Sequence, residues 1–390
     1  MNDALSDRGR SGQHGTSGGE PLSAPYTVVL THDVDHLSMR VLPFLSRAQL
    51  ALVKGLTYGN LKRLAQGRIA VSDYLASLAM AIRMPLVALG LARDPWEQSI
   101  GQVMRIEEEF GARSTFFFMP FAGRAGHVRP GQAASENRAS YYRLSDYAGL
   151  VRSLVERGWE VGIHGIDCHI SPAAATAERA ELAAIVGDGY RIGVRMHWLY
   201  SSPELRRNLA QAGCAYDATP GWNDRIGFPR ADEEPEVRGQ GTGTRGQAPV
   251  SNPQTPVSDS GSSPAYLPFP DPKTGLAVLP LNIQDVALLR EDHMGLKPEQ
   301  AWKAVEAVLD EASAHRAVVT VLWHNDSFLP PRCWAGLYRR ILERARRDGA
   351  ALERAVDAVS EETAAVATAV PRGGIEEKIA EGKIEYCWSD

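Results

Sequence analysis

Two aspartates and two histidines stand together near the start of the chain, in the stretch Thr31-His-Asp-Val-Asp-His36. They directly follow the run Tyr26-Thr-Val-Val-Leu30, which has the pattern of a buried β-strand. Enzymes with α/β folds keep their chemistry at the carboxyl ends of such strands. A nearby cation would hold one carboxylate ionised and leave the other free to handle protons, so the pattern indicates a metal ligand beside a general base. The alternative interpretation is that Asp33 and Asp35 only cap a turn.

Three other predicted strands also end in side chains that can do chemistry. These side chains are His164 after residues 159–163, Arg195 and His197 after residues 191–194, and His324 after residues 318–323. About seven predicted strands alternate with helices or loops, which favours a parallel sheet or barrel. Because the carboxyl ends of the strands of a parallel barrel meet at one face, the sequence predicts a single site built from four strand ends.

The chain is predicted to form one large domain with a tail at each end. Residues 1–24 are rich in glycine and serine and are expected to be a disordered tail, residues 25–360 form an α/β domain, and residues 361–390 form a C-terminal tail. Two insertions interrupt the domain. One is helical, at about 38–110 after the first strand, and the other is flexible and polar, at about 237–265.

The helical insertion contains the stretch that most resembles a membrane-spanning segment, residues 71–91. Asp73, Arg83 and Pro85 interrupt it, which argues against a transmembrane helix. Its larger apolar residues recur at helical spacing, so we expect an amphipathic helix with one face on the core. The predicted core face consists of Leu75, Leu78, Ile82 and Leu86.

Composition indicates a soluble globular protein of the cytoplasm. The chain has 390 residues, 44% of them hydrophobic, which is enough to bury a sizeable core. Its net charge of −5 gives no overall case for nucleic acid or an anionic membrane as a partner. The four cysteines form no CxxC pair and residues 1–23 contain no apolar signal region, so we expect reduced thiols, no secretory signal and a cytoplasmic location. The oligomeric state is left open.

Several short motifs follow one another along the chain. They are Thr31-His-Asp-Val-Asp-His36, Val161-Gly-Ile-His-Gly-Ile-Asp167, Gly193-Val-Arg-Met-His197, Tyr216-Asp-Ala-Thr219, Leu279-Pro-Leu-Asn-Ile283 and Leu322-Trp-His324. In residues and order they resemble the motifs of the polysaccharide deacetylases, the NodB-homology fold of carbohydrate esterase family 4. The resemblance is to a divergent branch whose first motif is His-Asp-Val-Asp, and it covers about residues 26–355 apart from the two insertions.

This resemblance implies a distorted seven-stranded (β/α) barrel, similar to a TIM barrel, with a helical insertion after the first strand. It also implies a divalent ion, zinc or a similar metal, held by one aspartate and two histidines. Carried over residue by residue, Asp35 and His164 are metal ligands and Asp33 is the general base. Arg195 orients Asp33, and His324 is the general acid.

The third metal ligand is an open choice, because this chain has Cys168 where the family has its second histidine. His169 is the next residue and can reach the metal if the turn bulges by one residue; Asp167 is the alternative. A site with Asp167 would be richer in oxygen ligands, which would favour Mn²⁺ or Fe²⁺ over Zn²⁺.

These residues suit the hydrolysis of an N-acyl bond. A divalent ion supplies a nucleophilic water and an electrophile for the carbonyl oxygen, Asp33 can take the proton of the water, and His324 can protonate the leaving nitrogen. We therefore expect a metal-dependent hydrolase that removes an acyl group, N-acetyl in the first place, from a sugar of a polysaccharide or its precursor. The side chains expected to line the sugar site are His197, Trp198, Asp217 and Trp222.

Two alternative functions stay open. The same barrel can carry an amidohydrolase or deformylase that acts on a small amide other than a sugar. The irregular second motif also admits a glycan-binding protein without catalytic activity. Against that alternative, a binding protein has no need of the base and the acid that Asp33 and His324 offer.

Overall fold

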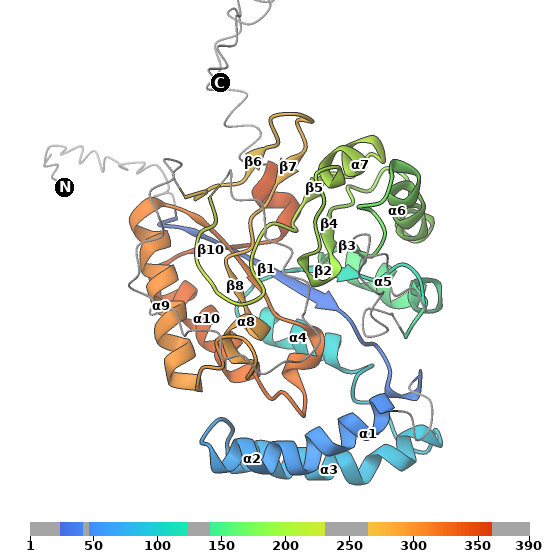
Figure 1. The fold of residues 1–390 in the computed structure, drawn as a ribbon, viewed down its shortest axis with the longest axis vertical. Helices are drawn as coiled ribbons and strands as arrows, with labels where there is room; N and C mark the ends of the chain where they lie inside the picture. Colours follow the sequence, from blue (N-terminus) through green and yellow to red (C-terminus); the bar gives the residue numbers. More distant parts are fainter. Residues whose placement is uncertain (1–23, 42–46, 123–140, 231–263, 361–390) are drawn as a thin grey trace, which may run out of the picture.

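The computed structural model describes residues 24–41, 47–122, 141–230 and 264–360. A curled, mostly parallel sheet runs through the middle of the molecule, and helices lie around it (Figure 1). The predicted tails, 1–24 and 361–390, lie outside the described residues except for residue 24. The polar insertion at 237–265 lies outside them except for residues 264 and 265.

Ten strands form one sheet in the described part of the chain. They are β1 (Thr27–Val34), β2 (Thr115–Phe118), β3 (Glu160–Gly165), β4 (Val194–Met196), β5 (Tyr216–Asp217), β6 (Phe269–Pro270), β7 (Ala277–Val278), β8 (Ile283–Gln284), β9 (Val318–Leu322) and β10 (Ala351–Glu353). Their order is β6-β7-β5-β4-β3-β2-β1-β9-β8, and β10 pairs with β1. Neighbouring strands are parallel except for β6 and β7.

One segment of chain joins the two ends of this sheet. β7 pairs with β5 at one end and β8 pairs with β9 at the other, and both strands belong to residues 277–284. Between them, Leu281 N donates to Pro220 O at 2.7 Å and Asn282 N donates to Thr320 O at 3.1 Å. The segment that contains β7 and β8 therefore bridges the two sides of the curled sheet, which has the shape of a distorted, partly open barrel.

The number of strands differs from the seven expected. Residues 276–283 read as a single strand in the sequence, but in the structure this stretch is divided into β7 and β8. Leu279 N donates to Asp217 O at 2.8 Å, and the next residue, Pro280, has no N–H with which to continue the ladder. β6 and β10 are further short strands that the sequence analysis does not predict.

Helices follow most of the strands, and the described residues between β1 and β2 are mostly helical. The α-helices of the described residues are α1 (Arg47–Lys54), α2 (Asn60–Ala65), α3 (Val71–Ala88), α4 (Ser99–Glu109), α5 (Ala148–Glu156), α6 (Pro172–Val186), α7 (Leu205–Gln211), α8 (Asp285–Leu289), α9 (Pro298–His315) and α10 (Ala335–Asp348). Shorter helical turns are η1 (Met39–Val41), η2 (Gly55–Gly59), η4 (Leu144–Tyr147), η5 (His197–Leu199) and η6 (Asn325–Phe328). Ser171 caps α6 by accepting a hydrogen bond from Ala174 N at 3.2 Å, and Gly349 ends α10 at a φ of 73°.

The barrel strands alternate between an outer and an inner apolar core. On β1, Val28 and Leu30 belong to the large core between the sheet and the helices, whereas Val29 belongs to a smaller core with Phe117 and Tyr216. Strands covered on both faces read as continuous apolar runs, as these do. The same alternation decides which polar side chains of β1 face the inside of the barrel.

The packing face predicted for α3 is wrong. Leu75, Ile82 and Leu86 are exposed by 59%, 75% and 44%, and Leu78 is half-buried. Helical periodicity shows which residues share one side of a helix, but it does not show which side is covered, and α3 is apolar on both. The side chains of α3 that are buried are Ser77, Met80, Met84 and Val87.

A substitution at Gly193, just before β4, tests how tightly the interior of the barrel is packed. A Cβ at this position would lie 2.0 Å from the ring of Tyr216 on β5. Because ring and strand are both buried, we expect Gly193→Ala to lower the free energy of unfolding by about 3 kcal/mol. Gly189→Ala is the matched control, since a Cβ there meets nothing within 4 Å. Urea denaturation measures both, and equal midpoints would contradict this packing.

Candidate active site

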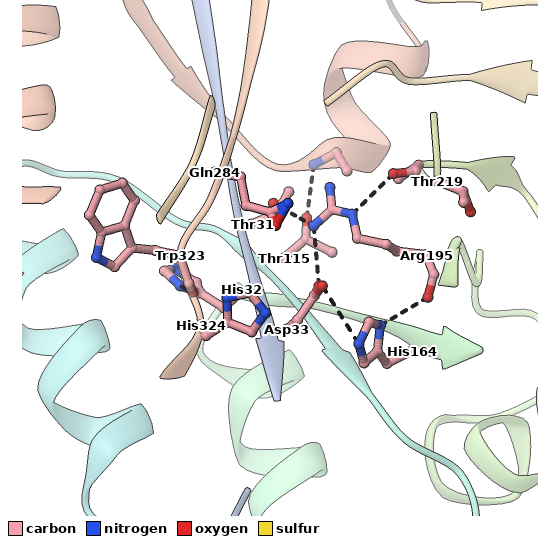
Figure 2. A network of polar contacts seen from close by, with 12 residues as sticks. Thr31, His32, Asp33, Thr115, His164, Arg195, Thr219, Gln284, Trp323 and His324 are labelled. Atoms are coloured by element: carbon pink, nitrogen blue, oxygen red, sulfur yellow. Dashed lines mark hydrogen bonds and ion pairs between the residues drawn. The ribbon is translucent and has the colours of Figure 1, made fainter. Parts of the chain in front are cut away.

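β1 brings two candidate catalytic carboxylates to the inside of the barrel. Thr31 and Asp33 point inward, and Asp35 continues the same two-residue alternation just after the strand. The side chain of Asp33 lies between Arg195 and His164 (Figure 2). One strand end therefore supplies both aspartates that the sequence singles out.

His32 points to the opposite side of β1 and anchors the strand. Its Nε2 lies 2.8 Å from Glu107 Oε1 on α4, and its Nδ1 lies 2.7 Å from Trp323 O after β9. Glu107 is fully buried and also accepts hydrogen bonds from three other side chains at 2.7 to 2.9 Å. These donors are Ser114, Trp159 and Tyr338. His32 is therefore a structural residue that fixes β1 beside β9.

Strand register places His164 beside Arg195. The two residues are paired across β3 and β4, and His164 Nδ1 lies 3.0 Å from Arg195 O. A backbone carbonyl can only accept a hydrogen bond, so this contact puts the proton on Nδ1 and leaves Nε2 as a free electron-pair donor. Nε2 lies 3.4 Å from Asp35 Oδ1 and 3.6 Å from Asp33 Oδ2.

Asp35, His164 and His197 form a triangle of candidate metal ligands. His164 Nε2 lies 2.9 Å from His197 Nδ1, which in turn lies 3.6 Å from Asp35 Oδ1. In the described chain, these three residues form the group of possible ligands whose ligand atoms lie within 4.8 Å of one another, close enough to hold a metal ion. Two ligands of a tetrahedral zinc ion stand about 3.3 Å apart, since each bond is about 2.0 to 2.1 Å long. The three edges of the triangle match that spacing.

The Oδ1 atom of Asp35 gives a second reason to assign a cation here. It is buried, and it accepts no well-formed hydrogen bond from any described residue. Burial alone would raise the pKa of Asp35, but the three histidines around it outweigh this effect and hold the pKa well below its usual value. A buried anionic oxygen that faces two imidazole nitrogens fits a divalent cation.

His197 takes the place that the sequence analysis gives to His169 or Asp167. His169 is directed elsewhere, with its ring centroid 4.4 Å from that of Tyr200 and its carbonyl oxygen accepting from Ser202 Oγ at 3.2 Å. The backbone N of Asp167 donates to Glu178 Oε1, which holds that turn against α6. Neither residue belongs to the group of possible metal ligands in the described chain, which consists of Asp35, His164 and His197, so we replace both candidates by His197. The sequence does contain a signal for His197, because His197 stands two residues after Arg195 and so shares the inner face of the strand.

Arg195 fixes the orientation of Asp33. Its guanidinium is fully buried, and Nη1 donates to Asp33 Oδ1 at 3.2 Å and to Thr31 Oγ1 at 2.7 Å. Nε donates to Ala218 O at 3.0 Å. Because one oxygen of Asp33 is held by Arg195, the other, Oδ2, is directed toward the metal triangle.

His324 faces the triangle from β9 and is held by Asp285, a residue that the sequence analysis missed. His324 Nδ1 lies 2.8 Å from Asp285 Oδ1, and the backbone N of His324 donates to Oδ2 at 2.9 Å. Burial alone would lower the pKa of His324, but Asp285 and then Asp35 outweigh it and raise the pKa to about 9. The Nε2 atom lies 3.9 Å from Asp35 Oδ2. Asp285 follows the Leu279–Ile283 motif by two residues, so its position at a strand end was the available signal.

The site opens on the side of Asp35 and His324. Their side chains are 17% and 11% exposed, whereas those of Asp33 and His164 are 4% and 2% exposed. Water and substrate can therefore approach from the side where the candidate metal triangle and His324 meet, while Asp33 and Arg195 stay covered. This arrangement resembles a hydrolytic centre, with a base and an acid on different strand ends.

Of the four predicted sugar-binding residues, the two tryptophans remain candidates, His197 is reassigned to the candidate metal triangle, and Asp217 does not face the site. Trp198 is partly exposed and stacks on His197, with ring centroids 5.5 Å apart. Trp222 is also partly exposed, and its carbonyl accepts from Gln284 Nε2 at 3.2 Å. Asp217 is buried and points outward to Arg206 of α7, at 3.4 Å. Its assignment to the sugar site is corrected, because its inward neighbour on β5 is Tyr216.

Comparison with known proteins gives several structural likenesses. No family model matches the sequence, and no curated protein matches it. The solved structure of PuuE allantoinase is similar over 91% of this chain and 97% of its own, with 13% identity and a TM-score of 0.47. A probable polysaccharide deacetylase from Pseudomonas aeruginosa PAO1 is similar over 86% and 90%, with 13% identity and a TM-score of 0.46. The peptidoglycan deacetylase PdaC from Bacillus subtilis is similar over 90% and 98%, with 12% identity and a TM-score of 0.34.

Metal content distinguishes His197 from His169 as the third ligand. We expect the wild-type protein to bind one zinc ion, and His164→Ala and His197→Ala to weaken binding by more than about 100-fold, because each removes one of three protein ligands. His169→Ala is the matched control and should retain the metal. Elemental analysis after dialysis measures the content. Loss of zinc in His169→Ala with retention in His197→Ala would contradict the triangle.

Substitution of Glu107 tests whether His32 anchors β1. Glu107→Ala would leave four buried donors without their acceptor, so we expect a loss of about 3 to 5 kcal/mol in the free energy of unfolding. Glu108→Ala changes the next residue, whose side chain is 37% exposed, and should cost much less. Chemical denaturation compares the two variants. Similar losses in both would show that His32 does not depend on Glu107.

Proposed function

We propose that this protein is a metal-dependent hydrolase that removes an acyl group, N-acetyl in the first place, from a sugar of a polysaccharide or its precursor. The observation that carries the proposal is the triangle of Asp35, His164 and His197, with Asp33 on one side and His324 on the other. A hydrolase of amides needs these three parts within reach of one another: a site for an electrophile, a base and an acid.

The metal assignment follows from the ligand set. Two imidazoles and one carboxylate, with an open side, are the kind of ligands that catalytic zinc sites use. With His197 in place of Asp167, the reason for preferring Mn²⁺ or Fe²⁺ is removed, so we propose Zn²⁺. When bound, such an ion polarises the carbonyl of the substrate and lowers the pKa of a water molecule.

Asp33 is the proposed general base. Its Oδ2 atom faces the triangle at 3.6 Å from His164 Nε2, and its Oδ1 atom is occupied by Arg195. A water molecule at the triangle would lie within reach of Oδ2, which can accept its proton. Arg195 is a positioning residue in this proposal, because it holds the carboxylate and does not itself face the open side.

His324 is the proposed general acid. Asp285 binds its Nδ1 atom and so directs Nε2 toward the open side of the site, near Asp35. A leaving amine must receive a proton when the C–N bond breaks, and Nε2 is placed to give it. Because base and acid come from different strands, each can be removed without disturbing the other.

The proposed substrate is a sugar because a partly exposed aromatic ring, that of Trp198, lies beside the triangle. Trp198 stacks on the ligand His197 and adopts a φ of 60°, which turns the chain sharply after β4. An aromatic ring at such a place offers a flat apolar face, and the apolar faces of pyranose rings pack on faces of this kind. Trp222, on the loop after β5, is also partly exposed, but the guanidinium of Arg225 lies over its ring, with Cζ 4.3 Å from the centroid.

A substrate panel tests the proposal. The zinc-loaded protein is incubated with N-acetylated oligosaccharides, a nucleotide-linked N-acetyl sugar, an O-acetylated sugar, a ureide and a formamide, and the released acid is identified by mass spectrometry. We expect acetate from at least one N-acetyl sugar. Turnover of the ureide or the formamide alone would contradict the sugar assignment, and no turnover with zinc bound would favour a binding protein.

Asp33 and His324 should be needed for turnover but not for metal binding. We expect Asp33→Asn and His324→Gln each to lower kcat by about 10² to 10⁴-fold, which is what general base or acid catalysis contributes. Zinc content should stay near that of the wild type, because neither residue belongs to the triangle. Asp292→Asn and His315→Gln, which change exposed residues of the same types, are the controls. Activity within threefold of wild type in Asp33→Asn would contradict its role.

A further inference from the structure

Exposed apolar side chains are concentrated on one part of the molecule. Among the large hydrophobic residues of the described chain that are exposed, all except Ile170 and Leu267 lie between Leu50 and Leu91. This stretch comprises α1, η2, α2 and α3, which lie together along the bottom of Figure 1, apart from the helices around the sheet. We call residues 47–93, which contain these four elements, the helical layer. Large apolar patches on a protein surface mark interaction sites.

α3 shows that this surface is an outer face and not part of a core. Its buried residues, Met80 and Met84 among them, pack against η1, η2 and Trp96 on one side. Asn60 Nδ2 donates to Ser77 Oγ at 2.7 Å on that same side. The exposed residues lie on the opposite side of the helix, spaced by four, seven and four positions. They are Val71, Leu75, Ile82 and Leu86.

The helical layer is fixed to the barrel near the candidate active site. Arg63 Nη2 donates to Arg332 O at 3.0 Å, and Arg68 Nη1 donates to Gly295 O at 2.7 Å. Arg332 belongs to the connection between β9 and α10 that also contains His324, and it pairs with Asp326 at 2.9 Å. The helical layer is therefore bound to the loop that carries His324.

The charge of the helical layer is opposite to that of the whole chain. The exposed charged residues between positions 49 and 93 are Lys54, Lys62, Arg83 and Arg93, and all are basic. The complete chain has a net charge of −5. An apolar face bordered by basic side chains is the pattern of helices that lie in the interface of an anionic membrane.

α3 is long and apolar enough to cross a membrane by its length and composition. Its contacts with η2, its bond to Asn60 and the covered face around Met80 would all be lost if it spanned a bilayer. A helix with one face packed on its own protein and one apolar face outward can instead lie along the surface.

We propose that the outer face of the helical layer docks on the surface of an anionic lipid bilayer. Leu75, Ile82 and Leu86 enter the boundary between headgroups and acyl chains, while Lys54 and Arg83 contact the lipid phosphates. If the proposed deacylase function also holds, docking brings the loop of His324 to the bilayer, where a lipid-linked glycan precursor would be presented. That consequence rests on the proposed function, whereas the docking itself does not.

Vesicle binding tests the docking without any assay of catalysis. The full-length protein is mixed with vesicles of phosphatidylcholine and phosphatidylglycerol, or of phosphatidylcholine alone, and bound protein is measured by flotation. We expect binding to the anionic vesicles only. The double variant Leu75→Ser/Ile82→Ser should lower the partition coefficient by at least about tenfold. Lys54→Gln/Arg83→Gln should lower it by about tenfold or more on anionic vesicles.

The control variant is Ile170→Ser/Leu267→Ser, which removes the two large exposed apolar residues that the described chain has outside the helical layer and should leave binding unchanged. Circular dichroism and zinc content show that each variant is folded. Three results would overturn the proposal: no flotation of the wild type, an equal loss in the control variant, or a wild-type dimer in sedimentation that Leu75→Ser/Ile82→Ser dissociates. The last would assign the face to a second copy of the chain.

Discussion

The two-residue alternation of β1 is the constraint on which the site depends. It turns Thr31, Asp33 and Asp35 to the inside of the barrel and His32 to the outside, where Glu107 and the carbonyl of Trp323 bind both ring nitrogens. A slip of one residue would turn the aspartates toward the helices and bring His32 inside. The buried bonds of His32 therefore hold the register in which Asp33 and Asp35 can act.

Within that register, neighbouring residues give similar side chains different environments. Asp33 is bound by the guanidinium of Arg195, while Asp35 faces imidazole nitrogens. The carbonyl of Arg195 binds Nδ1 of His164, so Nε2 of that ring keeps a lone pair that can bind a metal ion. Asp285 instead stabilises the protonated form of His324. A buried partner thus directs each of these residues to one chemical role, which is how a site can hold a ligand, a base and an acid within a few ångströms.

The strand-end residues could be predicted from sequence because each follows a short apolar run, and parallel strands bring such ends together. His197 and Asp285 were harder to assign: the first stands on a turn after only three residues of strand, and the second follows a strand of two residues. The division of residues 276–283 into β7 and β8 depends on contacts with β5 and β9 that no local pattern contains. For α3, the helical period is predicted correctly but the buried face is not, since only tertiary packing decides which of two apolar faces is covered.

We propose that Asp35, His164 and His197 hold a metal ion between Asp33 and His324. Anomalous diffraction at the zinc absorption edge, from crystals of the zinc-loaded protein, would locate such an ion. We expect one strong peak at bonding distance, about 2.0 to 2.2 Å, from Asp35, from Nε2 of His164 and from Nδ1 of His197. A peak bound to His169 or Asp167, or no peak at the triangle, would contradict it.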